Sequence, residues 1–503
     1  MNKDNNLRMV VQEIEPLQKK DLEEAPEHEV KPSGFPRLKF LKRQLFAAIA
    51  VSWVSLIIGY SSAFSAPAEH SIKRDFNLQG DSEISWMSSF MPLGALIGGL
   101  GGGSLIEYIG RKWTILLTNI LFFVAWFVCY FAQNYIYLYI GRILSGVSVG
   151  IASLTLPVYT AETLQPEVRG SLGLLSTVLG NIGILICFSF GIYYEWKGLS
   201  MIGVLLCVPF MVMIWFIPET PKFLLAQNDE AKARKALQWL RGAKTDVEKE
   251  FVDMQKFQKE TANDSENLLV LFKKKNMKLL GIELGLMFFQ QFSGINGIIF
   301  YITGLFDKSG SNINADVCTT IVGVVNFAAT FVASMLIDRL GRKVLLYISS
   351  VSMAISLAVL GLFFYLKDVV LMDLHSVDWL PLVCFMTYVL GFSLGFGPIP
   401  WLMLGEILPA KIRGPAASIS TAFSWTCTFV VTKTSLYFID TIGAHYTFWM
   451  YGFIVCCSLL FSIFIVPETK GFTLADIERK LTGVKVRRIS SLANIKPTPS
   501  FIG

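Results

Sequence analysis

The sequence predicts an all-α integral membrane protein with twelve transmembrane helices, arranged as two six-helix halves. Of its 503 residues 53% are hydrophobic and only 16% are charged, whereas a soluble chain carries about a quarter charged residues. The apolar residues occur in runs of about 20, the length that crosses the hydrocarbon core of a bilayer. Three motifs also recur in the same order in the two halves, which indicates a duplicated fold.

The first half begins after a charged stretch, residues 1–43, which lacks the short apolar core of a cleaved signal peptide. We therefore expect a cytoplasmic N-terminal tail and a first span that inserts the chain and is retained. The N-terminal half, 44–217, has its expected spans near 44–66, 83–106, 114–134, 138–160, 171–194 and 199–217.

A polar segment, 218–277, separates the halves and is expected to be a cytoplasmic linker with short helices. Within it "DEAKARKALQWLRG" (229–242) has the spacing of an amphipathic helix, since its apolar residues share one face. Acidic residues begin this segment and Gly242 ends it, as is typical of a capped helix.

The C-terminal half, 278–467, has expected spans near 278–306, 316–337, 344–366, 379–405, 415–437 and 446–467, followed by a cytoplasmic tail, 468–503. Its motifs repeat those of the first half. The pairs are "EYIGRK" (107–112) with "DRLGRK" (338–343), "PVYTAETLQPEVRG" (157–170) with "PWLMLGEILPAKIRG" (400–414), and "PETPKFLL" (218–225) with "PETKGFTL" (467–474). Such a parallel repeat predicts a solute site near the midplane, between the halves.

Basic residues set the expected orientation. The linker and the junctions after even-numbered spans hold most of the loop Lys and Arg. By the positive-inside rule this side is cytoplasmic, so both termini are expected there.

The stretch "FFQQFSGINGIIFY" (288–301) places three amides, Gln290, Gln291 and Asn296, inside a span. An amide donates and accepts hydrogen bonds without a net charge, which suits a neutral polyol. The alternative is that these amides tie one helix to another. On a straight helix Gln290 and Asn296 lie about 240° apart. For both to reach one sugar, the helix must bend or unwind between them, which Gly294 and Gly297 would permit. "GPIPW" (397–401) marks the tenth span as similarly interruptible.

The paired motifs, together with "QQFSGIN", "GPIPW" and "PETKG", resemble those of the sugar transporter family of the major facilitator superfamily, over roughly residues 44–480. "LGNIGIL" (179–185) and "SWTCTFVVTK" (424–433) look most like insect facilitated trehalose transporters, and next like animal facilitative hexose carriers. The resemblance implies uncoupled transport of a neutral sugar, most of all trehalose, by alternating access. Glucose or another hexose is the alternative substrate. We expect no enzyme activity, catalytic residue, cofactor or metal, because the sequence has no His/Cys metal cluster and no nucleophile motif.

The resemblance also implies which side chains contact the sugar or gate the path. The expected sugar contacts are Gln290, Gln291, Asn296, Asn326, Trp401, Thr177, Tyr301 and Trp425. Hexose carriers usually have glutamine in place of Thr177, and both they and many trehalose carriers have asparagine in place of Ser424. The expected gating charges, which would pair across the inner ends of the halves, are Arg111, Glu162, Arg169, Asp338, Arg342, Glu406 and Arg413. The alternative for the arginines is a topology signal at helix ends.

Proton coupling would require a carboxylate along the path, and the first span has none. Ser61 and Ser62 lie where related proton-coupled sugar carriers place an acid. The simple interpretation of Glu283, early in the seventh span near the cytoplasmic end, is that its side chain extends to water. Lys433 has no predicted role beyond pairing or reaching the outer interface. A proton-coupled symporter is therefore less favoured. A non-transporting sugar sensor is also less favoured, because such a sensor typically has a long cytoplasmic tail and only 36 residues follow Pro467. The expected partners are the sugar and the lipid bilayer, with no nucleic acid, in the plasma membrane by default.

Overall fold

The structure, a computed structural model, describes residues 38–78, 80–243, 245–262, 274–408 and 413–470. All regular elements in these ranges are helices. The chain divides into two units, Met1–Lys42 and Arg43–Gly503, and of the first only the last five residues, at the start of the first described helix, are described. The expected tails, 1–43 and 468–503, thus lie almost wholly outside the described residues.

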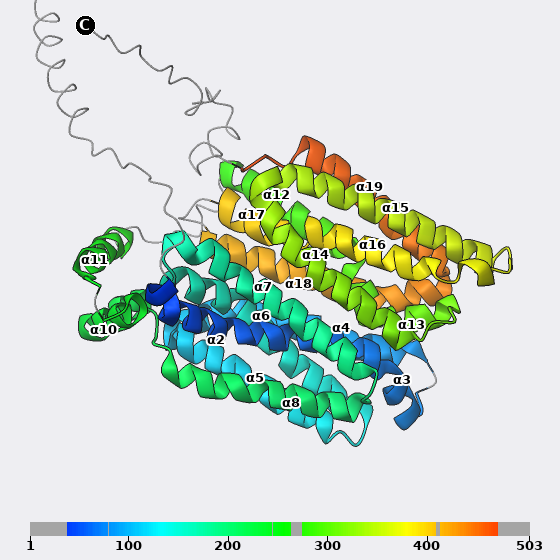
Figure 1. Ribbon diagram of the computed structural model, residues 1–503, viewed down its shortest axis with the longest axis horizontal. Coiled ribbons are helices and arrows are strands. Elements are labelled where there is room, and N and C mark those ends of the chain that lie inside the picture. The colour runs from blue at the N-terminus through cyan, green and yellow to red at the C-terminus, as the bar shows by residue number, and fades with distance from the viewer. Residues whose placement is uncertain (1–37, 79, 244, 263–273, 409–412, 471–503) are drawn as a thin grey trace, which may run out of the picture. The chain divides into compact units, whose positions relative to one another are not determined.

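The N-terminal half consists of long helices joined by short turns (Figure 1). They are α2 (Leu38–Ala63), α3 (Ser65–Asp75), α4 (Asp81–Ile109), α5 (Arg111–Tyr130), α6 (Tyr135–Thr163), α7 (Pro166–Gly191) and α8 (Trp196–Met213), which a 3-10 turn, η1 (Ile214–Phe216), extends. Apolar side chains hold them together, as at buried Trp126, whose ring meets Tyr60 at 5.5 Å and Phe64 at 5.1 Å between centroids.

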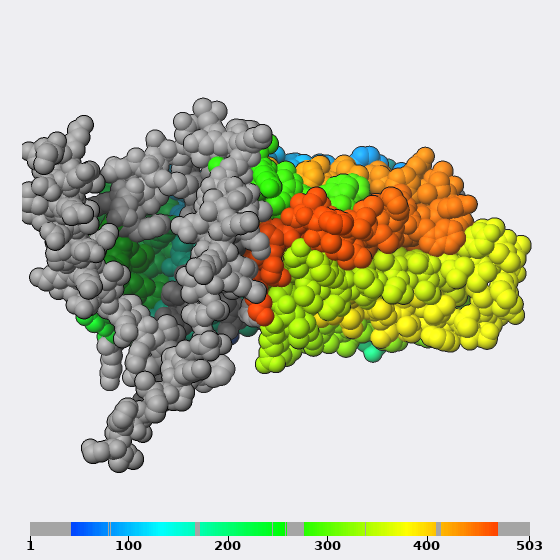
Figure 2. Space-filling model, turned by 90° about the horizontal axis from the view of Figure 1, so that it is seen from above, coloured from blue at the N-terminus to red at the C-terminus, as the bar shows by residue number. Residues whose placement is uncertain are grey.

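The C-terminal half repeats this plan with two of its spans interrupted. Its helices are α12 (Lys274–Phe292), α13 (Ile295–Ser309), α14 (Ala315–Leu340), α15 (Arg342–Asp368), the 3-10 turn η3 (His375–Val377), α16 (Leu380–Leu394), α17 (Ile399–Ile407), α18 (Arg413–Thr441) and α19 (Ala444–Phe464). Figure 2 shows α15 and α19 side by side on one face, in yellow-green and orange-red.

Among the described residues, ten helical segments are long and apolar enough to cross a membrane. The two remaining expected spans are special cases. The seventh is divided into α12 and α13, and the eleventh, α18, contains many Ser and Thr and one Lys. Together the segments make the twelve-span, all-α membrane fold that hydropathy predicted.

The halves meet most extensively through α4 with α18 and α7 with α14, and also through α3 with α13. The linker forms α9 (Pro221–Ala226), α10 (Glu230–Arg241) and α11 (Glu248–Ala262), and α10 and α11 lie at one end of the bundle (Figure 1). We call this end the linker side. The opposite end, with α3 and the end of α13, is the distal side.

The predicted amphipathic helix is confirmed as α10. The Asp229 carboxylate accepts from the Lys232 N–H, and Gly242 ends the helix. Its apolar face packs on Leu225, Val247 and Phe251. The nearly buried Arg241 guanidinium donates to the Thr163 carbonyl at 2.8 Å, which attaches the linker to the end of α6.

Candidate functional site

The seventh span is broken at Gly294. α12 ends at Phe292 and α13 begins at Ile295, and Gly294 has the left-handed angles φ +90° and ψ 5°. An added Cβ there would lie 2.6 Å from the Tyr451 ring. Glycine meets both requirements because it has no side chain. The break expected from the sequence is therefore present.

The tenth span is also broken, between α16 and α17, and Gln290 joins the two breaks. Pro400 has no N–H, so the Phe396 carbonyl four residues earlier has no helical donor. The Gln290 side-chain amide donates to Phe396 O at 2.7 Å and to Gly397 O at 2.9 Å. Gln290 thus satisfies carbonyls that the interruption leaves without helical partners.

The three amides of the seventh span form one hydrogen-bonded chain. Gln291 Nε2 donates to Gln290 Oε1 at 3.2 Å and to Ser424 Oγ of α18 at 3.0 Å. Gln291 Oε1 accepts from Asn296 Nδ2 at 2.5 Å. The broken helix therefore brings together side chains that a straight helix would point apart. We call Gln290, Gln291, Asn296 and Ser424 the amide cluster.

The members of the amide cluster differ in how many hydrogen-bonding groups remain free for a ligand. Gln290 and Gln291 are 3% and 6% exposed, and both N–H groups of each donate within the protein. Asn296 is half-buried, and among the described residues only one of its N–H groups is engaged. Its other N–H and its oxygen are free to bond a hydroxyl. The interhelical role set out as the alternative therefore fits Gln290, and the ligand role fits Asn296.

Asn326 and Tyr301 are buried and bonded within the C-terminal half. The oxygen of Asn326 accepts from Ser393 Oγ at 2.8 Å, which joins α14 to α16. The hydroxyl of Tyr301 donates to the Thr432 carbonyl at 2.9 Å, which joins α13 to α18. No contact in the described part of the chain connects either residue to the amide cluster.

The other expected sugar contacts have more freedom. Trp425 follows Ser424 in α18, and its indole N–H is buried without a partner among the described residues. Trp401 is 38% exposed, and Thr177 is exposed on α7. Trp425 is adjacent in sequence to one member of the amide cluster, Ser424, but no described contact joins the side chain of Trp425, Trp401 or Thr177 to the cluster.

Sequence reasoning missed Asn181, one turn after Thr177. Its amide donates to the Thr177 carbonyl at 3.1 Å and to Thr330 Oγ1 of α14 at 3.0 Å, so it bridges the two halves. An asparagine inside an apolar span is itself a sign of such a contact. "LGNIGIL" contained that sign.

The charged pairs on the linker side correct one expectation. Arg111 lies 3.1 Å from Glu162 within the N-terminal half. Arg342 donates two bonds to Glu406, at 2.7 and 3.2 Å, within the C-terminal half. The acids sit near the ends of α6 and α17, next to the arginines of their own half, so these pairs do not cross between the halves as expected. The side chains of Arg169, Asp338 and Arg413 lie outside the described residues.

The repeated "PET" motif has the same role in both halves. The Glu219 carboxylate accepts from the backbone N–H of Arg111 and Lys112, at the start of α5. The Glu468 carboxylate accepts from Arg342 and Lys343 N–H at the start of α15. A carboxylate is stabilised at a helix N-terminus by free N–H groups and by the helix dipole. The structural duplication thus extends to individual hydrogen bonds.

Two buried ionisable side chains bear on proton coupling. The Arg142 guanidinium donates to Ser61 O at 2.8 Å and to Ser61 Oγ at 3.2 Å, so both of these acceptors are neutral groups. Glu283 is 0% exposed, and neither carboxylate oxygen has a partner among the described residues. The expectation that Glu283 reaches water is therefore wrong, because neighbouring helices enclose this part of α12.

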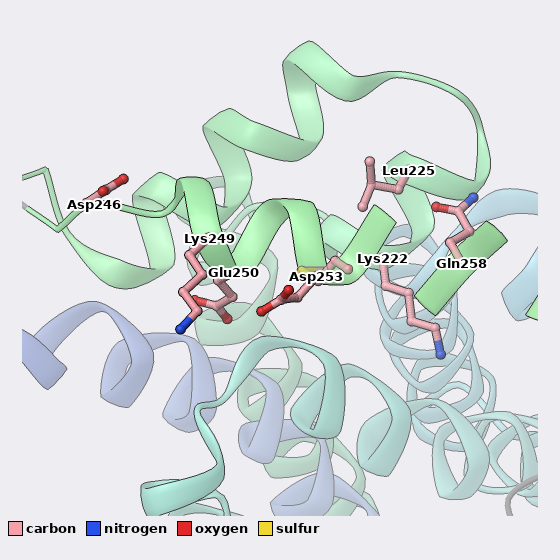
Figure 3. A pocket seen from close by; sticks show the side chains of 8 residues that line it. Lys222, Leu225, Asp246, Lys249, Glu250, Asp253 and Gln258 are labelled. Atoms are coloured by element: carbon pink, nitrogen blue, oxygen red, sulfur yellow. The ribbon is translucent and has the colours of Figure 1, made fainter. Parts of the chain in front are cut away.

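A pocket of about 560 Å³ lies in the linker, away from the amide cluster. Figure 3 shows its lining of mixed charge, which includes Lys222, Lys249, Glu250, Asp253 and Gln258. Because the pocket contacts linker residues and not the spans, it is not part of a path across the membrane.

The chain matches the family described as "Sugar (and other) transporter" over residues 47–481. A relative from Aedes aegypti, described as "Facilitated trehalose transporter Tret1", is 54% identical over 91% of this chain and 57% of its own length. A relative of the same description from Polypedilum vanderplanki is 54% identical over 91% of this chain and 92% of its own length. The chain spans about half the length of the Aedes and Drosophila relatives.

Solved structures share the fold. The inward-open xylose transporter XylE from E. coli has a TM-score of 0.73 at 25% identity, over 87% of this chain and 99% of that one. The proton:xylose symporter XylE bound to 6-bromo-6-deoxy-D-glucose has a TM-score of 0.72 at 24% identity, over 89% of this chain and 100% of that one. The chain therefore belongs to the sugar transporter family of the major facilitator superfamily, whose members are multi-pass membrane transporters and not enzymes.

Proposed function

We propose that the chain carries trehalose down its concentration gradient, by alternating access between the halves 44–217 and 278–467. The observation that carries this proposal is 54% identity, over 91% of the chain, to proteins described as facilitated trehalose transporters. The amide cluster adds a physical reason. Its groups donate and accept without net charge, as a sugar does, so no buried ion has to be compensated.

Asn296 is the proposed primary polar contact for the sugar, because its free N–H and oxygen are half-buried beside a helix break. Gln291 and Trp425 would complete the site. The amide oxygen of Gln291 has a second lone pair, and Trp425 offers an indole N–H and an apolar ring to the sugar's C–H face. Gln290 would act mainly by holding α12 to the break between α16 and α17.

Uncoupled transport is supported by the first span. α2 contains no Asp or Glu, and the buried guanidinium of Arg142 pairs with neutral groups of Ser61. The basic loops support a cytoplasmic linker side, and we propose the plasma membrane as the location. The linker-side pairs Arg111–Glu162 and Arg342–Glu406 would brace each half as it moves.

Two alternatives remain, each with its own observation. A hexose is the alternative substrate. Ser424 and Thr177 are shorter than the asparagine and glutamine usual at these positions in hexose carriers, but they are polar side chains as well. Proton coupling is the alternative mechanism, because Glu283 is a buried carboxyl inside a membrane span, and such carboxyls are typical proton relays.

The test is uptake of radiolabelled trehalose and glucose into oocytes at outside pH 5.5 and 7.5, followed to equilibrium. We expect trehalose to enter saturably and to stop at the outside concentration at both pH values. Uptake of glucose without uptake of trehalose would instead identify the chain as a hexose carrier. Accumulation above the outside concentration at pH 5.5, abolished by Glu283→Gln, would overturn uncoupled transport.

A further inference from the structure

Lys433, for which the sequence indicated no defined role, joins the two halves of the molecule. Its ammonium lies 4.1 Å from the centroid of the Trp86 ring of α4 and donates to Ser85 Oγ at 3.2 Å. The same Ser85 hydroxyl donates to the backbone carbonyl of Lys433 at 3.0 Å. One lysine in the C-terminal half thus makes three contacts with two adjacent residues of the N-terminal half.

The contact lies towards the distal ends of both helices. α4 begins at Asp81 and α18 ends at Thr441, so Trp86 and Lys433 are each within about two turns of those ends. The Trp86 ring is itself held, because it stacks on Phe90 at 5.3 Å between centroids.

Other contacts also cross between the halves on the distal side. His70 Nε2 of α3 lies 2.6 Å from Asp307 Oδ2 of α13. The described arginine–glutamate pairs of the linker side, in contrast, run within each half. Two contacts that involve a basic side chain, Lys433 with Trp86 and His70 with Asp307, therefore join the halves on the distal side.

We propose that Lys433 is the cation of a latch, formed with Trp86 and Ser85, that holds the distal side closed and must separate each time that side opens. It is a positioning residue, not a sugar contact, and it sets the balance between the two access states. This inference rests on the alternating access proposed above.

The chemistry suits a reversible latch. In the closed state the ring face and the serine hydroxyl replace part of the water around the ammonium, and on opening water returns to it. The cost of separation is therefore small. A cation–π contact of this kind changes a two-state equilibrium by about 2- to 30-fold.

The experiment measures how readily the distal side opens. A reporter cysteine replaces Ser88, which lies on α4 near Ser85 and is 0% exposed, and a membrane-impermeant thiol reagent is applied from the distal side. Lys433→Gln and Trp86→Leu are each expected to raise the labelling rate by about 2- to 30-fold. Lys433→Arg, which keeps a cation, is expected to leave the rate within about two-fold. The chain without the reporter gives the background of the native cysteines, and cell-surface amount corrects for folding.

The double variant Lys433→Gln/Trp86→Leu is expected to label no faster than either single variant, because both remove the same contact. Equal labelling in Lys433→Gln and the parent, or rates that multiply in the double variant, would overturn the latch. Influx and efflux of trehalose are measured in the same cells. If no variant carries trehalose while the labelling pattern holds, the proposed substrate fails and the latch stands. If trehalose is carried and labelling does not change, the latch fails alone.

Discussion

Replacing Asn296 with alanine separates the two readings of the amides, sugar binding and helix attachment. Asn296 makes one described hydrogen bond, to Gln291, and has one N–H and one oxygen without a partner among the described residues. A neutral hydrogen bond contributes about 0.5–1.5 kcal/mol net. If both free groups bond the sugar, Asn296→Ala removes about 1–3 kcal/mol of binding, which is about a 5- to 150-fold rise in KM.

The stability of the Asn296→Ala variant should fall only slightly, because a hydrogen bond such as the one to Gln291 contributes about 0.6 kcal/mol in a membrane helix pair. Gln290→Met is the matched control. It keeps the length of the side chain but leaves the Phe396 and Gly397 carbonyls without their described side-chain donor. Each unsatisfied buried carbonyl costs about 1–3 kcal/mol, so this variant should lower the thermal midpoint clearly.

The assay is trehalose uptake over a concentration series, paired with thermal unfolding of the purified protein with and without trehalose. The expected pattern is a raised KM with a nearly unchanged midpoint for Asn296→Ala, and a lowered midpoint for Gln290→Met. An unchanged KM together with a lowered midpoint in Asn296→Ala would refute the sugar-binding role, and would assign all three amides to helix attachment.

Three further outcomes are expected. Gly294→Ala forces a side chain into a left-handed backbone position, where its Cβ would lie 2.6 Å from the Tyr451 ring. The variant should lose at least about 1–2 kcal/mol of stability and most of its transport activity. A thermal midpoint equal to the parent's would contradict this. The hydrogen bond and charge of Asp307 raise the pKa of His70, so this contact is complete below the ordinary histidine pKa and is lost as pH rises through the raised value. Trehalose uptake from the distal side should therefore increase, by up to about five-fold for an exposed pair, between pH 5.5 and 8, and His70→Gln should remove the increase; a rise towards low pH would oppose it. Ser61→Asp places a carboxylate beside Arg142, so uptake should become dependent on outside pH, and an unchanged pH profile would show that the pair does not titrate during transport.

The sequence by itself determined the features that depend on neighbouring residues. Hydropathy gave the spans, because a segment's preference for lipid is a sum over its own side chains. The breaks at Gly294 and before Pro400 were predictable, because φ and the missing N–H are properties of those residues. The duplicated motifs predicted two similar halves, and Glu219 and Glu468 do cap equivalent helices.

Only the tertiary structure decided which polar groups meet. Gln290 bonds a carbonyl 106 residues away, and Lys433 meets a ring on α4 across the interface between the halves. Helical spacing gives the face that a side chain occupies, but its partner depends on the rotation and relative height of two packed helices. The arginine–glutamate pairs show what the sequence could not determine. The sequence identified Arg111, Glu162, Arg342 and Glu406 as charges that would form pairs. Packing within each half determined which arginine pairs with which glutamate.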